Sequence, residues 1–478
     1  MSLHSSKLLQ VWTATEHRQI AAKSSTTTYV NYHIEAPACS EVERRPIDLV
    51  VVLDKSGSMA GQKLELCKQT MQFLSRELSS SDRVALVSYD SHVTLNLPLT
   101  KMDQGGKALL SQRVEAIHAG SCTNLSGGLI AGLDEVQEAT RLDGEAPNPV
   151  QSVLLLTDGL ANEGIVNKTA LIRYVEKMLS KNVSLFTFGY GSDHDADILR
   201  QLSDLGQGAY YFVQNIDGVS IAFADCLGGL LSVVAQNIKV DIIAAPGVSI
   251  AAVKTKRRVD TIVAGTHVSV DLGDLYSEEA RDLVVQLEVG PVMHCDVETL
   301  AEFRIRYTNV LTLTKDSSVT TCTVDRPVVV TDTTVDSGLI QQLQRIETAE
   351  AIEAAQCEAN QGNLSGGTAR LRALADKFRR NFADRGVDAS VGQERALLDD
   401  LNDCCVAMAN THIYRERGQY RMASRAQTHY TQRSNDSEIS WEVIREEDST
   451  RTRTGQTSIG TYRNDAKRKI ISRAFDTK

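Results

Sequence analysis

Three oxygen-bearing side chains follow the end of an apolar run near residue 50. Asp54, Ser56 and Ser58 occupy alternate positions in the stretch VVVLDKSGSM, which spans residues 50–59. Carboxylate and hydroxyl oxygens are the ligands that hard divalent cations such as Mg²⁺ prefer. The spacing therefore predicts a cation site where a buried strand ends.

Two further segments supply similar donors. Asp158 closes the apolar run VQSVLLLTD, and Thr123 lies in SCTNLSGG, at the predicted start of a helix. Ligands of open parallel sheets bind outside the carboxyl ends of the strands, so we expect these segments to meet in one crevice. Two carboxylates nearly neutralise a divalent ion, and three hydroxyls change its charge little. A site of this kind, holding Mg²⁺ or Mn²⁺, would favour an incoming carboxylate at a vacant coordination position.

The elements that must position these residues alternate between short apolar runs and helical patterns. Residues 47–53, IDLVVVL, form a continuous apolar run that is typical of a strand buried on both faces. In the helix predicted after it, the apolar residues recur at steps of three and four: Leu64, Cys67, Met71, Leu74 and Leu78. The alternation continues to a helix expected at 216–236. Residues 47–236 therefore predict a doubly wound, mostly parallel α/β sheet.

The pattern changes on both sides of this domain. Residues 237–333 contain only strand patterns with short turns, which predicts an antiparallel β-sandwich. Residues 26–37 alternate as one more strand without a sequence neighbour to pair with, so we expect the segment 1–46 to contribute a strand to the sandwich. The α/β domain would then be inserted in the sandwich. A helical hairpin is expected at 334–412, and a polar, partly disordered tail at 413–478, with ordered pieces attached to the rest.

The five candidate ligands resemble a known motif. Asp54-Lys55-Ser56-Gly57-Ser58 matches the DxSxS sequence of the von Willebrand factor A domain, whose metal-ion-dependent adhesion site also uses a threonine and a second aspartate. Thr123 and Asp158 match those two positions. The resemblance implies a Rossmann-like α/β fold, a metal held by Asp54, Ser56, Ser58, Thr123 and Asp158, and a partner's acidic side chain completing the coordination. Ser121 replaces a glycine common in relatives, which removes no ligand.

The flanking segments are similar to those of plant RING-type ubiquitin ligases that carry this domain. The similarity lies in VDSGLIQQLQRIETAEAIEAA and YRMASRAQTHYTQRS. A RING needs paired cysteines, and the nine cysteines of this chain include no CxxC motif. The resemblance therefore does not carry ligase activity to this chain.

Other functions receive little support from the sequence. The net charge of −10 argues against broad nucleic-acid binding. The glycines of FGYGSDHD (188–195) lack the third glycine of a dinucleotide loop, and KSGSM is not the GxSxG of a hydrolase. His194 is expected at the surface start of a helix, and the KRK at 467–469 is expected to be a solvated basic tail.

The expected location is the cytoplasm. The amino-terminal residues lack the basic-then-apolar pattern of a signal peptide, and no run of about 18 apolar residues predicts a membrane span. Scattered cysteines indicate free thiols in a reducing compartment.

These observations favour a non-enzymatic adaptor or scaffold that docks a partner's acidic residue on Mg²⁺ or Mn²⁺ and assembles into a larger complex. Two alternatives remain: an accessory subunit of a ubiquitin ligase, and a structural component of a large assembly. No catalytic residue is predicted.

Overall fold

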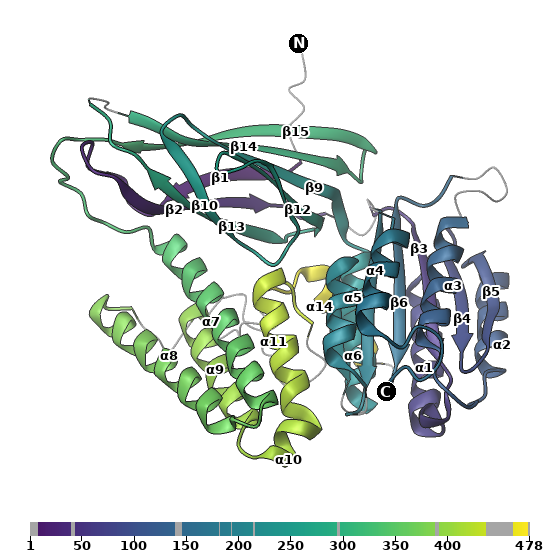
Figure 1. Cartoon of the computed structure of the whole chain (residues 1–478). Coiled ribbons are helices and arrows are strands. Elements are labelled where there is room, and N and C mark those ends of the chain that lie inside the picture. The colour runs from purple at the N-terminus through teal and green to yellow at the C-terminus, as the bar shows by residue number, and fades with distance from the viewer. Residues whose placement is uncertain are drawn as a thin grey trace, which may run out of the picture. The chain divides into compact units, whose positions relative to one another are not determined.

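A computed structural model of the chain is drawn in Figure 1 and describes residues 8–39, 44–138, 146–180, 182–192, 194–213, 216–293, 297–387, 392–435 and 462–476. The chain forms two compact units. One combines residues 1–40 with residues 233–350, and the other combines residues 41–232 with residues 351–478. The predicted donors all lie in the second unit.

A six-stranded sheet forms the centre of the second unit. The strand order is β5-β4-β3-β6-β7-β8, and every neighbouring pair is parallel except β4 with β5. This order confirms the predicted mostly parallel sheet. The strands are β3 (Ile47–Asp54), β4 (Arg83–Tyr89), β5 (Val93–Lys101), β6 (Val150–Thr157), β7 (Val183–Tyr190) and β8 (Gln207–Val213).

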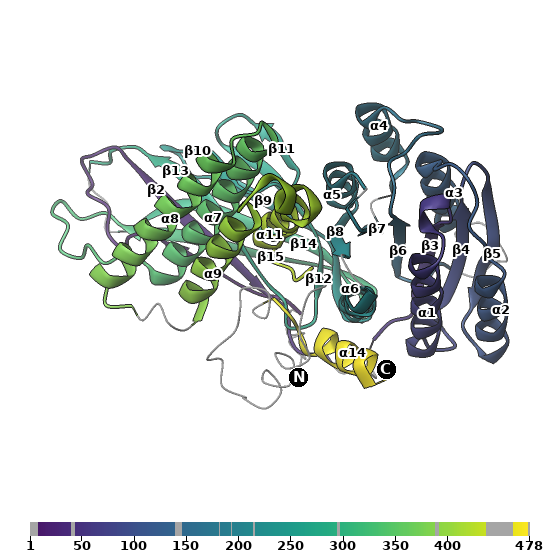
Figure 2. The same cartoon turned by 90° about the horizontal axis from the view of Figure 1, so that it is seen from below.

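Helices cover both faces of this sheet (Figure 2). Apolar residues of α3, α4 and α5 pack with one face of the strands in a single core cluster. On α1, the predicted stripe from Leu64 to Leu78 is buried, and α1 packs beside α6 and α2. The helices are α1 (Gln62–Glu77), α2 (Gln104–Glu115), α3 (Leu125–Glu138), α4 (Lys168–Met178), α5 (Ala196–Leu205) and α6 (Ile216–Leu230).

The helices after residue 351 pack with this unit. In α8 and α9, the predicted apolar stripes around Leu371 and Leu401 are buried in one cluster. Helix α14 lies against α6, where Gly228 lets the two backbones approach: a Cβ there would stand 2.6 Å from the Cα of Lys467. These helices are α7 (Ser337–Asn360), which begins in the first unit, α8 (Leu364–Asp384), α9 (Gly392–Ala407), α10 (Thr411–Ile413), α11 (Gln419–Thr431) and α14 (Asp465–Asp476).

The outer edge of β8 is covered by side chains from α11 and the residues that follow it. Gln427 Oε1 accepts a hydrogen bond from Tyr210 N at 2.8 Å, and Asn435 Nδ2 donates to Tyr210 O at 3.1 Å. These amides take the place of a neighbouring strand. Because an uncovered edge invites pairing with another chain, α11 is a structural part of this unit.

The first unit is a β-sandwich of two antiparallel sheets, with orders β1-β2-β13-β10 and β11-β12-β9-β14-β15. Strand β2 pairs with β13 along its whole length, which confirms that the 26–37 strand joins the sandwich and that the α/β domain is inserted in it. The strands are β1 (Gln10–Thr15), β2 (Thr26–Glu35), β9 (Val233–Ala244), β10 (Val248–Lys254), β11 (Val259–Val263), β12 (His267–Tyr276), β13 (Ala280–Val289), β14 (Val297–Asn309) and β15 (Thr314–Asp325).

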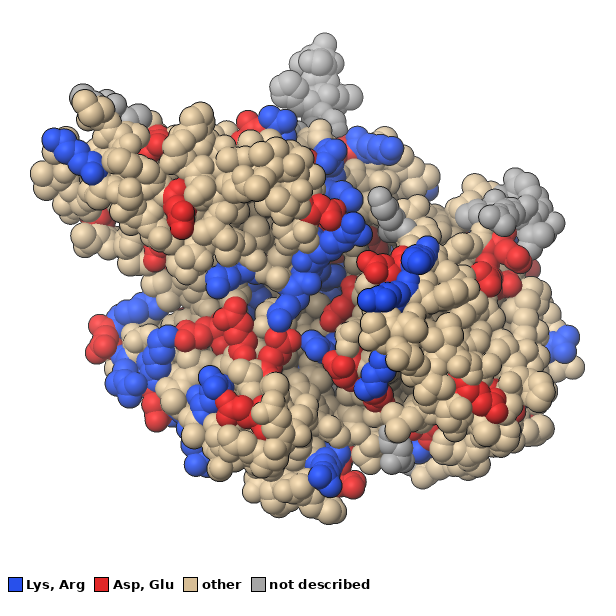
Figure 3. Space-filling view, in the orientation of Figure 1, with Lys and Arg blue, Asp and Glu red and all other residues tan. Residues whose placement is uncertain are grey.

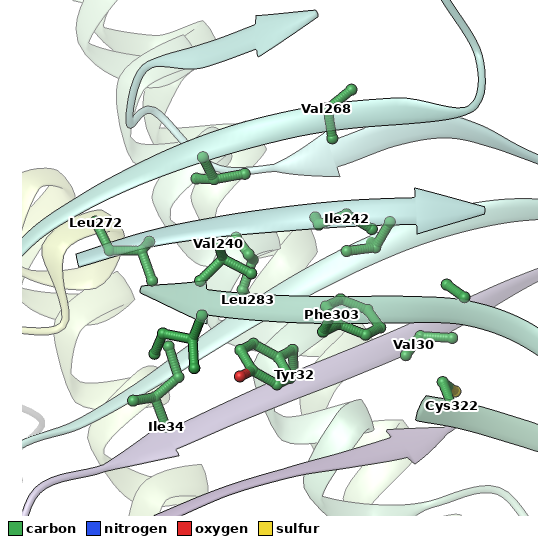
Figure 4. Close-up of a cluster of buried hydrophobic side chains, with 14 of the residues drawn as sticks. Val30, Tyr32, Ile34, Val240, Ile242, Val268, Leu272, Leu283, Phe303 and Cys322 are labelled. Atoms are coloured by element: carbon green, nitrogen blue, oxygen red, sulfur yellow. The ribbon is translucent and has the colours of Figure 1, made fainter. Parts of the chain in front are cut away.

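Alternate residues of β2 point into the sandwich core (Figure 4). Val30, Tyr32 and Ile34 are completely buried, as the two-residue period of a strand requires. The ring of Tyr32 stacks on Phe303 of the opposite sheet with centroids 4.8 Å apart. The phenol ring therefore contributes apolar packing between the two sheets.

Charged side chains at the sandwich surface pair with one another. Arg306 contacts Asp241 at 2.7 Å and Arg258 contacts Asp260 at 2.9 Å. On the molecular face drawn in Figure 3, acidic and basic side chains appear together. Exposed pairs of this kind each contribute little to stability.

Three expectations from the sequence are corrected. The helix expected at 216–236 ends at Leu230, and β9 begins at Val233. His194 is buried rather than at the surface, because Gly189 leaves room for its ring and Tyr210 Oη lies 2.6 Å from its Nε2; burial lowers the pKa of His194 to about 4. Lys467 of the KRK stretch is also buried, paired with Asp225 of α6 at 2.8 Å.

The tail prediction is divided. Helices α11 and α14 are ordered pieces of the region 413–478, whereas residues 436–461 of the predicted tail lie outside the described residues. No helix in the described part of the chain has the length and apolarity needed to cross a membrane.

Candidate metal centre

Asp54 lies at the carboxyl end of β3, in the middle of the sheet, and is completely buried. Its carboxylate accepts hydrogen bonds from Ser56 N at 2.8 Å, from Thr157 Oγ1 at 2.7 Å and, at 3.4 Å, from Tyr89 Oη. All three donors are neutral. Burial raises the pKa of Asp54, although the bonds from Ser56 and Thr157 act to lower it, and Asp158 raises it further.

Asp158 lies beside Asp54 because β3 and β6 are parallel neighbours with Leu53 level with Leu156. It is also completely buried. Ser58 Oγ donates to Asp158 Oδ1 at 2.7 Å, and the hydroxyls of Ser56 and Ser58 are 3.2 Å apart. The alternate spacing in DKSGS thus turns both serine hydroxyls toward the two carboxylates.

Hydrogen bonds join the loop that carries Thr123 to the loop after β3 and to the loop after β6. Gly57 N donates to Ser121 O at 2.9 Å, and Gly120 N donates to Lys55 O. Thr123 N in turn donates to Asn162 Oδ1 at 2.8 Å. The loops after β3, before α3 and after β6 are therefore held as one assembly.

Gly159 shows how closely these loops approach. A Cβ built on it would lie 3.5 Å from Thr123 Oγ1 and 3.6 Å from Ser58 Oγ. The structure therefore brings together all five residues predicted from the sequence: Asp54, Ser56, Ser58, Thr123 and Asp158.

Two contributors were missed in the sequence. Thr157 holds Asp54, and Lys63, in the first turn of α1, forms an ion pair with Asp158 Oδ2. The position of Lys63 could have been noticed in the sequence. A cation in the first turn of a helix is opposed by the helix dipole, which suggests that the lysine has another role there. Thr157 gives no such signal, since its hydroxyl is indistinguishable in sequence from that of any threonine in a strand.

The donor set suits a hard cation. Two carboxylates and three hydroxyls converge. Within the described residues, no group of three or more His, Cys, Asp or Glu side chains is placed to hold a metal ion. Among the same residues, no Lys, Arg or His forms an ion pair with Asp54. A buried carboxylate without a cation is costly, which fits a site built to hold one.

The family comparison agrees with this geometry. The model of the von Willebrand factor type A domain matches residues 48–223, the span of the six-stranded sheet and its helices. Residues 48–223 form a von Willebrand factor type A domain. Such domains are protein-interaction modules, and this one carries the five motif residues at the carboxyl ends of its central strands.

A plant protein extends the similarity beyond the von Willebrand A domain. The chain is 34% identical over 253 residues to the E3 ubiquitin-protein ligase WAV3 of Arabidopsis thaliana. The match covers 52% of this chain but 31% of the length of the plant protein.

Two solved structures share the fold over most of the chain. The von Willebrand factor type A protein from Catenulispora acidiphila has a TM-score of 0.65 at 16% identity, covering 84% of this chain and 91% of its own. The ArnB paralog VWA2 from Sulfolobus acidocaldarius has a TM-score of 0.57 at 14% identity, covering 88% of this chain and 98% of its own. At these identities the likeness is one of fold.

Proposed function

We propose that this chain is a non-enzymatic adaptor whose von Willebrand A domain binds a partner's carboxylate through Mg²⁺ or Mn²⁺. Asp54, Ser56, Ser58, Thr123 and Asp158 would hold the ion. The observation that carries the proposal is Asp54 itself, a completely buried carboxylate that meets only neutral donors in the described structure.

The residues of the site have different roles in the proposed binding. Asp54 and Asp158 supply negative charge from neighbouring strands, and the parallel pairing of β3 with β6 holds the two strand ends side by side. Ser58 is exposed, so the site opens to solvent on that side. When bound, a divalent ion would supply a Lewis-acidic position for a partner's carboxylate.

The first test is a Mg²⁺ titration of the full chain by calorimetry, with wild type and Asp54→Ala compared. We expect saturable binding by the wild type, none by the variant, and similar circular dichroism spectra for both. An unchanged titration in the folded variant would remove Asp54 from the site and contradict the proposal.

The second test asks whether the ion controls partner binding. Pull-downs are compared for wild type in Mg²⁺, wild type in EDTA and Asp54→Ala in Mg²⁺. A partner captured only in the first sample supports metal-dependent docking. The same partners in all three samples would favour the structural role, with the ion bracing the loops.

A second candidate function is participation in a ubiquitin-ligase complex, favoured by the 34% identity to WAV3. It predicts that a tagged chain co-purifies with a RING protein or with ubiquitin conjugates. A chain that forms conjugates alone with E1, E2 and ubiquitin would instead be a ligase itself.

A further inference from the structure

Lys63 has a position that helix formation does not explain. It is the second residue of α1, whose N-cap is Gly61, and a cation there is opposed by the partial positive charge of the helix N-terminus. Its Nζ nevertheless contacts Asp158 Oδ2, while Ser58 Oγ occupies Oδ1 of the same carboxylate. Both oxygens of this predicted metal ligand are therefore engaged by groups of the chain itself.

The ion pair compensates Asp158. The Asp158 side chain is 0% exposed, and an unpaired charge at such depth is strongly destabilising. Lys63 is therefore the cation of the chain itself that neutralises the charge of Asp158.

The same lysine is free to leave. Its side chain is 34% exposed, and its Nζ lies 3.8 Å from the Cβ position of Gly191, at the end of β7. The ammonium thus occupies the rim of the site, on a flexible stem that can turn to solvent without disturbing the core. Asp158, by contrast, is fixed in the sheet end between Ser58 and the strand.

We propose that Lys63 is a further functional residue of this site: the internal counter-ion of Asp158, which a divalent metal must displace in order to bind. The inference rests on the proposed function, because it assumes that Asp158 ligates the metal. The ion pair between Lys63 and Asp158 lowers the affinity of the site for metal, because any metal that binds must first break this pair.

Lys63 also sets the charge of the loaded site. Asp54, Asp158 and Lys63 together carry one net negative charge. Addition of a divalent ion converts this to one net positive charge, provided that Lys63 stays at the rim. A net positive site at the end of the sheet attracts an anionic group more strongly than the neutral site formed by the ion and two carboxylates.

Lys55 provides a matched control. It lies in the loop that carries Ser56 and Ser58 and pairs with Asp90 at 2.7 Å, and Asp90 is not one of the five predicted ligands. Removal of Lys55 takes one positive charge from the neighbourhood of the site without freeing Asp158.

The experiment measures Mg²⁺ affinity by calorimetry, and melting temperature in EDTA, for the full-length wild type, Lys63→Met, Lys63→Arg and Lys55→Met. Lys63→Met should bind Mg²⁺ about tenfold more tightly, the equivalent of ~1.4 kcal/mol, because the competitor is gone. It should melt at a lower temperature in EDTA and recover in Mg²⁺. Lys63→Arg should resemble wild type, and Lys55→Met should change affinity by less than about twofold. Lys63→Gln serves as a second neutral variant and should behave as Lys63→Met does.

Failure of this inference and failure of the proposed function give different results. Mg²⁺ binding by wild type with equal or weaker binding by Lys63→Met and Lys63→Gln would overturn the role of Lys63 and leave the metal site intact. If Lys55→Met bound Mg²⁺ more tightly to the same extent, the gain would come from the loss of any nearby positive charge. That result would also overturn the role of Lys63. No Mg²⁺ binding by any of the proteins would overturn the proposed function, and this inference with it.

Discussion

The two ends of β3 each bury an aspartate, and they satisfy it in opposite ways. At the amino end, Asp48 accepts two hydrogen bonds from Arg83, at 2.7 and 2.6 Å. At the carboxyl end, six residues later on the same strand, Asp54 meets Ser56, Thr157 and Tyr89, all of them neutral. Both side chains are completely buried, so depth does not distinguish them.

Neighbouring acids follow the same division. Asp82, just before β4 at the amino end, receives two hydrogen bonds from Arg44, at 3.0 and 2.7 Å. Burial acts to raise the pKa of Asp82, but Arg44 and the backbone N–H groups of Ser79 and Ile47 together lower it below its usual value.

At the other end, burial raises the pKa of Asp54. Asp82 with its arginine therefore serves the fold, and Asp54, which has neutral donors alone, is the acid proposed to bind a cation. Asp158 combines both features, because it is a predicted ligand that pairs with Lys63.

The largest effect is expected at the amino end. Arg83→Met leaves Asp48 buried and without its main cation, and should lower the free energy of unfolding by about 3–5 kcal/mol. Equilibrium urea denaturation measures the loss. The double variant Arg83→Met with Asp48→Asn should recover part of it, and a loss below ~1 kcal/mol in the single variant would show that Asp48 is satisfied without Arg83.

At the carboxyl end, Asp54→Asn should separate stability from metal binding. In EDTA the variant should be as stable as wild type or more stable, because a neutral amide is easier to bury than a carboxylate. With Mg²⁺ at about 100 times its Kd, wild type should gain about 2.7 kcal/mol and the variant nothing.

Thermal unfolding with and without Mg²⁺ measures both effects. A variant much less stable than wild type in EDTA would mean that Asp54 is a structural acid like Asp48.

The stability of the protein at acid pH should depend on Arg44. The pKa of Asp82 is lower in the folded protein than its unfolded value of about 3.9, so its contribution is present above pH ~4 and is lost as the pH falls through the folded pKa. Arg44→Met removes the part of that contribution that the guanidinium supplies and should move the acid-unfolding midpoint to higher pH, as followed by circular dichroism.

Asp54→Asn is the control for this pH dependence, because the pKa of Asp54 is shifted the other way. Its contribution is present below the unfolded pKa and is lost as the pH rises through the folded pKa. Asparagine resembles the protonated acid at every pH, so the variant keeps the stability that wild type has at acid pH, and its acid midpoint should not rise. Equal midpoints for wild type and Arg44→Met would contradict the assignment of Asp82.

The smallest effect is expected for Tyr89→Phe. The bond from Tyr89 Oη to Asp54 is long, at 3.4 Å, and Asp54 keeps its bonds from Ser56 and Thr157. Stability should fall by about 0.5–1.5 kcal/mol, and the Mg²⁺ affinity should change less than about threefold. A complete loss of Mg²⁺ binding would place the phenol among the groups that hold the ion.

Local patterns in the sequence were sufficient for much of the fold. The continuous apolar run 47–53 became a strand buried on both faces, and the three-four spacing of α1 became its buried stripe, because burial follows directly from periodicity. The alternation in residues 26–37 likewise predicted a strand, and the structure shows that Val30, Tyr32 and Ile34 form its core face. The five motif residues were found because DxSxS, the threonine and the second aspartate keep fixed places in the family's sequence pattern.

The tertiary structure decided which distant segments are in contact. No local pattern pairs Thr157 with Asp54, or Lys63 with Asp158, since each pair is separated by about a hundred residues. The same reason explains the wrong expectations: Lys467 appears solvated until α14 packs on α6 and brings it to Asp225. The sequence by itself determined which residues could bind a cation. Only the packing of the sheet ends decided which buried acids already have a partner in the chain and which one has neutral donors alone, because the cost of a buried charge depends on what surrounds it in space.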